Sequence, residues 1–319
     1  MKIHSASIFE VVKALKRNLI KKLSKDMPPV TPNASLEAKE LLQFLYSISG
    51  KQTLTGQHCN PLAGSTRLPG IHKLTGHYPA VFGQDFGFSA AGTWDGINFR
   101  QQIVDKAIRR HEEGFIITLM WHAVRPIDEE PVIFEQSIEG SLTAKEWEEL
   151  VTPGSEINER WKSQVDVIAW FLKQLREAAV PVLWRPYHEM NGDWFWWGKK
   201  TGEFGYKKLY QMLFERLANF HGLNNLLWVF NANEVRENVD PYELYFPGAD
   251  IVDILATDVY RGGFAGRIMK ICRRWPAANP SRWGRWAGCH RPIFCTTNPA
   301  GHGSCCGETH PLYGWKEKQ

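Results

Sequence analysis

The stretch from Trp184 to Trp197 combines residue types that can carry out acid/base chemistry on a sugar. It reads Trp-Arg-Pro-Tyr-His-Glu-Met-Asn-Gly-Asp-Trp-Phe-Trp-Trp, so the carboxyl group of Glu189 stands among aromatic side chains. Apolar surroundings raise the pKa of a carboxyl group, as a general acid requires, and exposed aromatic rings suit flat, weakly polar ligands such as sugar rings. The alternative is structural: an ion pair of Arg185 with Glu189, and tryptophans that belong to the core.

The elements that must position this stretch alternate along the chain from residue 36 onward. Short apolar runs have the character of strands, and longer segments have the spacing of amphipathic helices. Strands are predicted at 51–58, 79–86, 115–122, 180–189, 226–230 and 251–260, and helices at 36–48, 98–112, 158–178 and 206–220. Because parallel strands need crossover connections, this alternation predicts an α/β fold with a parallel sheet.

Polar and aromatic residues gather where the predicted strands end. A (β/α)8 barrel builds its active site at the carboxyl ends of its strands, whereas a doubly wound sheet rarely draws on so many strands at once. The chain has neither a Gly-x-Gly-x-x-Gly motif nor a Walker loop, which argues against a nucleotide-binding fold. We therefore predict a (β/α)8 (TIM) barrel whose site draws on these strand-end residues: His58, Asp85, His122, His188, Glu189, Asn231, Asp258 and Tyr260.

Residues 184–198 resemble the acid/base segment of glycoside hydrolase family 26, whose members are chiefly β-mannanases. The resemblance covers roughly residues 36–265 and includes the segments 50–58, 121–126 and 256–260. It implies a (β/α)8 barrel and hydrolysis of β-1,4-mannosidic bonds with retention of configuration. Retention requires two carboxylates about 5–5.5 Å apart, one as acid/base and one as nucleophile.

The resemblance also implies a role for each site residue. Glu189 is the acid/base. The other implied site residues line the subsite at the cleavage point (His122 and His188), pack against the sugar (Trp194 and Phe230) or orient the nucleophile (Tyr260).

The residues alone leave structural roles open for several of these positions. His122 is also consistent with a satisfied core histidine, and Phe230 with a core aromatic. Asp85 and Asn231 are expected to form hydrogen bonds within the barrel, and Asp258 to orient its neighbours. No cofactor and no metal is expected: the two site histidines raise the question of zinc, but nothing else in the body of the chain has metal-ligand spacing.

Residues 266–319 differ sharply from the rest of the chain. They contain five of the six cysteines and carry a net charge of +7, against −3 for the remainder, and such a break marks a boundary. The resemblance implies a nucleophilic Glu at the end of a seventh strand, followed by an eighth strand ending in Trp. The tail offers only Glu308, after Ser-Cys-Cys. We therefore expect strands 7 and 8 to be missing or disrupted, the tail to be poorly packed, and the first and sixth strands to expose unpaired edges.

A displaced reading frame explains the composition of the tail. Codons for Cys and Trp begin with TG, and a shift of one base turns them into codons ending in TG, which encode Leu, Met or Val. With permitted third bases, residues 277–287 can then be read as Gly-Lys-Pro-Ile-Ala-Leu-Gly-Glu-Val-Gly, and residues 299–307 as Arg-Trp-Ala-Trp-Phe-Met-Leu-Trp-Gly. These stretches resemble the family's nucleophile segment and eighth strand. A genuine divergent tail is the alternative; a zinc knuckle is disfavoured because its spacings match no common pattern.

Three segments are therefore expected: a basic N-terminal extension (1–30), a glycosidase barrel of six strands (31–265) and an aberrant C-terminal tail (266–319). The extension has helical apolar spacing and a basic face, which favours packing on the domain or a mobile extension over a membrane-surface helix. It forms no signal-peptide h-region, and the family usually acts outside the cell, so the localisation stays open. The net charge of +4 leaves no nucleic-acid footprint, and no apolar run is long enough to span a bilayer.

The sequence thus predicts a retaining β-mannanase that acts on β-mannan or manno-oligosaccharides, inactive as written because the nucleophile is absent from this reading frame. No obligate protein partner is implied. Two alternatives remain: a non-catalytic carbohydrate-binding remnant, and a sister activity on β-1,3-xylan or mixed-linkage β-glucan.

Overall fold

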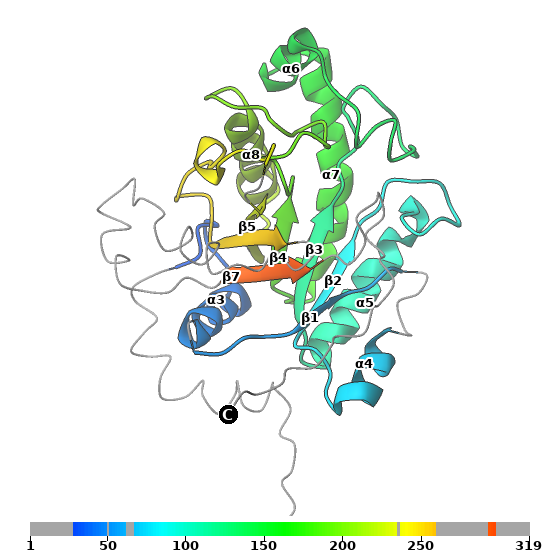
Figure 1. Cartoon of the computed structure of the whole chain (residues 1–319), viewed down its shortest axis with the longest axis vertical. Helices are drawn as coiled ribbons and strands as arrows, with labels where there is room; N and C mark the ends of the chain where they lie inside the picture. The colour runs from blue at the N-terminus through cyan, green and yellow to red at the C-terminus, as the bar shows by residue number, and fades with distance from the viewer. Residues whose placement is uncertain (1–27, 50, 62–66, 235–236, 260–292, 298–319) are drawn as a thin grey trace, which may run out of the picture.

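Seven parallel strands lie side by side in chain order and curl into part of a barrel (Figure 1). The computed structural model describes residues 28–49, 51–61, 67–234, 237–259 and 293–297. The strands are β1 (Gly56–His58), β2 (Val81–Asp85), β3 (Ile116–Trp121), β4 (Val182–Pro186), β5 (Leu226–Asn233), β6 (Ile254–Val259) and β7 (Ile293–Thr297). The prediction of an α/β fold with a parallel, barrel-type sheet is confirmed.

Helices connect consecutive strands from β1 to β5 and cover the outside of the sheet (Figure 1). The α-helices are α3 (Leu36–Ile48), α4 (Arg67–Thr75), α5 (Arg100–Glu112), α6 (Ala144–Val151), α7 (Glu156–Glu177) and α8 (Tyr206–Phe214). Helix α8 continues as the π-helix η2 (Glu215–Phe220), and two short 3-10 helices are η1 (Ile97–Phe99) and η3 (Tyr242–Leu244). Helices α4 and α6 were not among the predicted elements.

The seventh strand corrects an expectation from the sequence. Strand β7 is built from tail residues and pairs in parallel with β6, from Leu255 opposite Ile293 to Val259 opposite Thr297. The expectation that the sixth strand exposes an unpaired edge is therefore wrong for Leu255–Val259. Ile-Phe-Cys-Thr-Thr is a short run of apolar and β-branched residues, which suits a strand. Among the described residues β1 pairs with β2 alone and no eighth strand follows, so the sheet stays open there.

The inner face of the sheet changes from apolar to polar along the strands. Side chains alternate between the two faces of a strand, so in β6 Ile254, Ala256 and Asp258 share one face. At the amino ends, helix α3 closes the inner face with apolar contacts, and the buried cluster there comprises Ala38, Leu42, Leu45, Ala80, Val81, Ile116, Leu183, Leu227, Val229, Ile254 and Ala256. This packing fixes the inward positions at the carboxyl ends, where the polar side chains stand.

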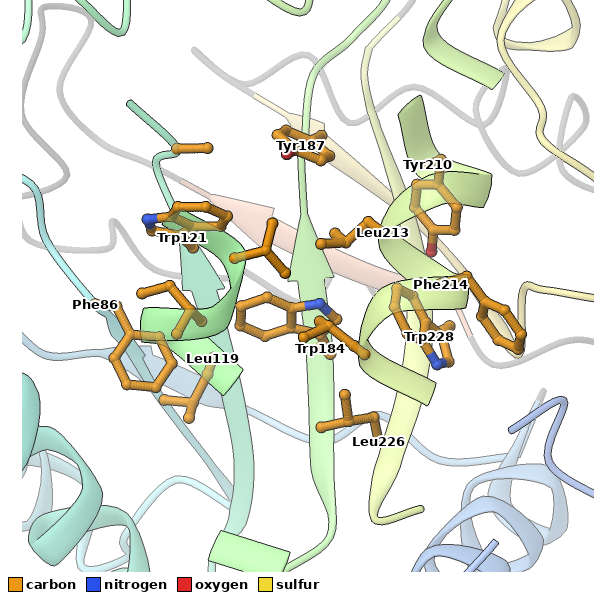
Figure 2. Close-up of a cluster of buried hydrophobic side chains, with 14 of the residues drawn as sticks. Phe86, Leu119, Trp121, Trp184, Tyr187, Tyr210, Leu213, Phe214, Leu226 and Trp228 are labelled. Carbon is orange, nitrogen blue, oxygen red and sulfur yellow. The ribbon is translucent and has the colours of Figure 1, made fainter. Parts of the chain in front are cut away.

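The outer face packs against the helices through large side chains (Figure 2). Trp184 of β4 lies between Leu119 of β3 and Trp228 of β5 in this layer, and each of the three is fully buried. Burial of each such side chain contributes about 1.5–3 kcal/mol to stability. Many of the chain's tryptophans therefore belong to the hydrophobic core. For Trp184, this agrees with the structural alternative considered from the sequence.

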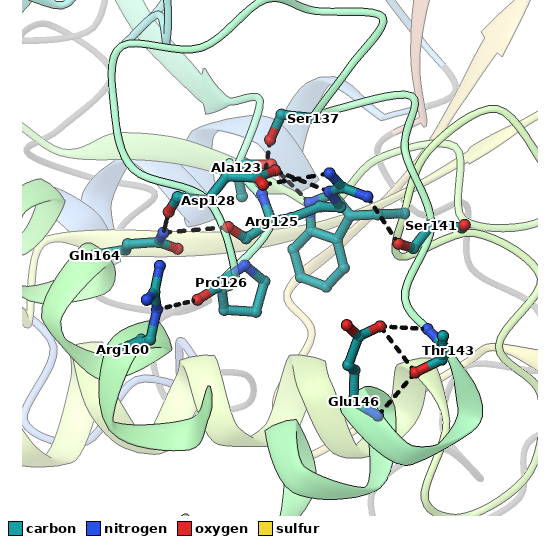
Figure 3. A network of polar contacts seen from close by, with 11 residues as sticks. Ala123, Arg125, Pro126, Asp128, Ser137, Ser141, Thr143, Glu146, Arg160 and Gln164 are labelled. Carbon is teal, nitrogen blue, oxygen red and sulfur yellow. Dashed lines mark hydrogen bonds and ion pairs between the residues drawn. The ribbon is translucent and has the colours of Figure 1, made fainter. Parts of the chain in front are cut away.

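A polar network fastens the long loop after β3 to helix α7 (Figure 3). Arg125 donates from Nε to Asp128 (2.8 Å) and from one Nη to the carbonyl of Ser141 (2.9 Å). From α7, Arg160 donates to the carbonyl of Pro126 (2.7 Å). The network holds this loop over the carboxyl ends of β3 and β4.

The chain is anchored to the barrel from its first described residues. The backbone N–H of Val30 donates to Asp253 (2.8 Å), and the hydroxyl group of Thr31 donates to the carbonyl of Leu226 (2.8 Å). Most of the predicted basic extension, residues 1–27, lies outside the described residues. Within the described part of the chain, no helix has the length and apolar character that crossing a bilayer requires.

Candidate active site

The backbone turns sharply where β4 ends. Tyr187 and Glu189 have φ values of 47° and 57°, in the left-handed region that residues other than glycine seldom occupy. The N–H of Glu189 donates to the carbonyl of Asn231 on β5 (2.7 Å), which holds this conformation. Strained backbone of this kind concentrates at functional sites.

The carboxyl group of Glu189 is buried and hydrogen-bonded. Its Oε2 accepts a hydrogen bond from the indole Nε1 of Trp194 (2.7 Å), and it shares a hydrogen bond with the carboxyl group of Asp258. Two carboxyl groups in contact cannot both be ionised at low cost, so one proton sits between them. Burial and then the charge and hydrogen bond of Glu189 raise the pKa of Asp258 to about 8, against the opposing charge of Arg185.

Arg185 ties this carboxyl pair to the sheet. One Nη donates to both oxygens of Asp258 (3.1 and 3.3 Å), and Nε donates to the side chain of Asn231 (3.0 Å). Arg185 therefore pairs with Asp258 on β6, and Asp258 lies between Arg185 and Glu189. The expectations that Asn231 forms hydrogen bonds within the barrel and that Asp258 orients its neighbours agree with these contacts.

His122 and His188 lie together in the site. Their rings meet edge to face, with centroids 4.6 Å apart and an interplanar angle of 85°. Phe195 packs against both rings, at 5.5 Å from His122 and 5.1 Å from His188. Burial lowers the pKa of His188 well below the ordinary value, and the charges of His122 and Arg185 add to this effect. None of the described residues offers a hydrogen-bond partner to its Nδ1.

His122 has a charged partner, unlike His188. Its Nδ1 is hydrogen-bonded to a carboxylate oxygen of Asp85, and its backbone N–H donates to the other oxygen (3.3 Å). Burial alone would lower the pKa of His122, but the charge and hydrogen bond of Asp85 outweigh it and raise this pKa above the ordinary value. The pKa values of the two site histidines are therefore shifted in opposite directions.

Trp194 is half-buried at the rim of the site. Its six-membered ring lies over Gly192, where a Cβ atom would stand 2.1 Å from the indole Cη2. Only glycine at position 192 leaves room for the indole, which explains why a glycine stands two residues before Trp194. The indole edge is fixed by Glu189 while part of the ring stays exposed to solvent, as a sugar-stacking platform requires.

The other two predicted sugar-site residues are Phe230 and Tyr260. Phe230 is 1% exposed and packs edge to face against Tyr206 (6.3 Å) and Phe246 (5.5 Å). This placement favours the core alternative for Phe230, and its contact with sugar stays a prediction. Tyr260 lies outside the described residues, so its predicted role is untested.

The sequence predictions did not include a loop between β2 and η1 that borders the site. Burial, and then the negative charge of Asp85, raise the pKa of Asp95 to about 6, while the charge of His122 opposes the shift. Its carbonyl accepts backbone hydrogen bonds from Phe88 and Ser89 (2.8 and 2.9 Å). The preceding residue, Trp94, is 50% exposed, an unusual position for an indole and the signal that could have drawn attention to this loop.

In the described part of the chain, no three His, Cys, Asp or Glu side chains are grouped so that they could hold a metal ion. The arrangement provides a buried, hydrogen-bonded carboxyl pair, an indole ring beside it, and two histidines whose pKa values are shifted in opposite directions. Those are the parts of an acid/base site for a polar, ring-shaped ligand.

Comparisons with known proteins point the same way. The family model for glycosyl hydrolase family 26 matches residues 30–271. A mannan endo-1,4-beta-mannosidase of Thermothelomyces thermophilus is 37% identical over 242 residues, which cover 73% of this chain and 46% of that protein. Mannan endo-1,4-beta-mannosidase A of Piromyces sp. is 32% identical over 253 residues, covering 76% and 39%. The chain thus spans less than half the length of either of these curated relatives.

Solved structures share the fold. GH26A from Muricauda sp. matches with a TM-score of 0.75 and 38% identity, over 85% of each chain. The beta-mannanase from a symbiotic protist of the termite Reticulitermes speratus, solved as a complex with a gluco-manno-oligosaccharide, matches with a TM-score of 0.69 and 28% identity, over 85% of this chain and 81% of that one.

Proposed function

The chain belongs to glycosyl hydrolase family 26, and from this membership we propose that its barrel is a retaining glycosidase domain for β-1,4-mannosidic bonds in mannan. Glu189 is the acid/base residue in this proposal. The observation that carries the assignment is its place: buried at the end of β4, with one carboxyl oxygen held by Trp194 and a proton shared with Asp258.

In the proposed reaction Glu189 gives its proton to the glycosidic oxygen as the bond to the leaving group breaks. Asp258 and Arg185 orient Glu189 and keep a proton within the pair until substrate arrives. A carboxylate nucleophile on the opposite face of the sugar forms a glycosyl-enzyme, which water then hydrolyses with Glu189 acting as base. Proton transfer by a positioned side chain typically contributes about 10²–10⁴-fold to the rate.

Sugar recognition falls to residues around this carboxyl group. Trp194 supplies a ring face, and His122 and His188 supply polar edges to the hydroxyl groups of the sugar at the cleavage point. Tyr260 is assigned the orientation of the nucleophile through the family resemblance.

The chain as written lacks that nucleophile, and we propose that it is inactive for this reason. Strand β7 occupies the place of the seventh strand, and its residues Ile293-Phe-Cys-Thr-Thr297 include no carboxylate. A frameshift near Ala265 accounts for the loss, since the displaced frame restores a Glu whose codon straddles Gly284 and Arg285.

Activity on galactomannan, measured for the chain as written and for a frame-restored protein, tests both parts of the proposal. We expect turnover from the restored protein and turnover at or near the uncatalysed level from the chain as written. Robust turnover by the chain as written would overturn the inactivity and direct the search to Glu308. No turnover by a folded restored protein on galactomannan, with turnover on β-1,3-xylan or mixed-linkage β-glucan, would replace the substrate class. Sequencing the locus decides whether the frame is displaced.

A second candidate is a sugar-binding protein without catalysis. The absence of a carboxylate in β7, together with an intact Trp194, His122 and His188 cluster, favours it for the chain as written. Binding of manno-oligosaccharides without turnover, measured by calorimetry, would support this function.

A further inference from the structure

Asp85 lies beside His122, and its carboxylate is fixed by several hydrogen bonds. Besides its bond to Nδ1 of His122, its carboxylate accepts the backbone N–H groups of Gly87 (3.1 Å) and His122 (3.3 Å). Both side chains are nearly inaccessible to solvent, at 3% and 4% exposure. A carboxylate with three N–H donors stays ionised, and the pKa of Asp85 is accordingly held below its ordinary value, mainly by His122, against the effect of burial.

We propose that Asp85 is a positioning residue that keeps His122 as an imidazolium and leaves its Nε2–H as a fixed hydrogen-bond donor in the sugar site. A ring whose Nδ1–H is bonded to a buried carboxylate has one orientation and one free edge. The use of that edge by a sugar hydroxyl rests on the proposed function, whereas the charge state of His122 does not.

The groups that face His122 favour its positive charge. Asp85 comes from β2, Asp95 from the following loop and Glu189 from the end of β4, and each of these carboxyl groups favours the imidazolium. Two neighbouring histidines, His188 and His58 of β1, would disfavour this charge if they were protonated. The pKa of each is lowered, which favours the neutral form. Burial lowers the pKa of His58 to about 4.

Three aromatic rings packed against His122 limit the water that could otherwise solvate the charge. Phe88, Phe134 and Phe195 all lie edge to face with His122, at centroid distances of 6.2, 5.7 and 5.5 Å. In such surroundings an imidazolium persists only with a bound counter-charge. Two adjacent imidazoliums would repel each other, so Asp85 also determines that His122 rather than His188 carries the proton.

Nitrogen chemical shifts of the histidine rings test the charge state in the full chain. In the ¹⁵N-labelled wild type, both ring nitrogens of His122 should be protonated at and somewhat above the ordinary histidine pKa of about 6.5. Loss of its signals in His122→Gln assigns them. In Asp85→Asn, which keeps the shape but not the charge, the ring should titrate at lower pH. An unprotonated Nε2 in the wild type at that pH would overturn the proposal even if no variant folds.

Asp166→Asn is the matched control, because it removes a second Asp–His contact far from the site. Asp166 on α7 meets Nε2 of His221 (2.6 Å) and also binds Arg216. This variant should leave the His122 signals unchanged. An identical His122 titration in Asp85→Asn and wild type would refute the proposal, as would an equal shift in Asp166→Asn.

Calorimetric binding of mannohexaose tests the positioning role. Loss of a charge-assisted donor should weaken binding about tenfold or more in Asp85→Asn, with no further loss when His122→Gln is added. Unchanged affinity in an Asp85→Asn protein whose His122 titration has moved would overturn the positioning role. Failure of the wild type to bind mannohexaose would instead count against the proposed function, and the ring titration would still decide the charge state.

Discussion

The indole Nε1 of Trp194 donates a hydrogen bond of 2.7 Å to Oε2 of Glu189. One side chain thus serves two purposes: its edge orients the carboxyl group, and its face remains available at the rim of the site. The contact bridges the turn that follows β4, where Gly192 lies beneath the ring. In the proposed function, this contact joins the proton donor to the ring on which a sugar would stack.

Replacing Trp194 separates these purposes. Trp194→Phe keeps a ring face but loses the donor, so turnover of a frame-restored protein should fall more than sugar affinity. Trp194→Ala loses both, and affinity should fall as well, by about 2- to 13-fold if the lost stacking contact contributes about 0.5–1.5 kcal/mol. Steady-state kinetics and calorimetry measure the two effects.

Gly192→Ala tests the same contact from below. A methyl group there would stand 2.1 Å from the indole, so the ring must move and the variant should lose affinity like Trp194→Ala. Gly154→Ala is a glycine control on the surface, since a Cβ atom there meets nothing within 4 Å, although its φ of 84° adds local strain.

Unchanged kinetics in Trp194→Ala with a large fall in melting temperature would make Trp194 a core residue.

Glu189→Gln in a frame-restored protein should remove proton donation to the leaving oxygen. The expected loss in turnover on galactomannan is about 10²–10⁴-fold. Aryl mannosides with good leaving groups need that proton less, so the glycosylation step should be affected less for them. Near-parental turnover on galactomannan would show that another group is the acid.

The raised pKa of Asp258 makes stability depend on pH. Its pKa is about 8 in the folded protein, against about 3.9 for an unfolded aspartate, so the folded state holds the proton between these values. Stability from this group is complete below about pH 4 and is lost as the pH rises through 8. In Asp258→Asn, whose amide stays neutral, the melting temperature should decline less between pH 5 and pH 8 than in the wild type. Parallel declines in the two proteins would contradict the shared proton.

The sequence predicts the fold well where apolar pattern decides the structure. Strands β2 to β6 and helices α3, α5, α7 and α8 fall within the predicted ranges or close to them. Strand β1 is shorter than predicted, because residues 51–53 are exposed and carry no apolar side chain to bury. Helix α4 contains Pro69 and Gly70, which weaken a helical pattern. Helix α6 was missed although its capping box, Thr143 with Glu146, is visible in the sequence.

The site was predicted less completely, because its partners depend on how strands align. Glu189 contacts Trp194 and His122 contacts His188, while the roles that the family resemblance implies for these residues stay predictions. The bond of Asp85 to His122 could not be predicted, since it requires β2 and β3 to pair with Asp85 opposite Met120. Likewise, the inward or outward direction of Phe230 depends on the phase of β5, which a continuous apolar run does not specify.

The pairing of β7 with β6 leads to a prediction about the tail. In a parallel sheet, the backbone groups of successive residues of β6 bond alternately to β5 and to β7. Removing residues 266–319 should therefore speed hydrogen exchange at those β6 amides that face β7, while the amides that face β5 stay protected. Each lost bond should lower the free energy of unfolding by about 0.5–1.5 kcal/mol.

Removing only residues 298–319 provides the control, because it retains Ile293–Thr297 and the five residue pairs from Leu255–Ile293 to Val259–Thr297. This shorter deletion should leave β6 as protected as in the full chain. If both deletions left the exchange of β6 unchanged, the tail would not stabilise the sheet edge. If the shorter deletion by itself already speeded hydrogen exchange at the β6 amides, residues beyond Thr297 would be needed to hold β7 against β6. Because β6 carries Asp258, loss of β7 should also loosen the Arg185–Asp258 pair, and the pH dependence of stability described for Asp258 should weaken in the longer deletion.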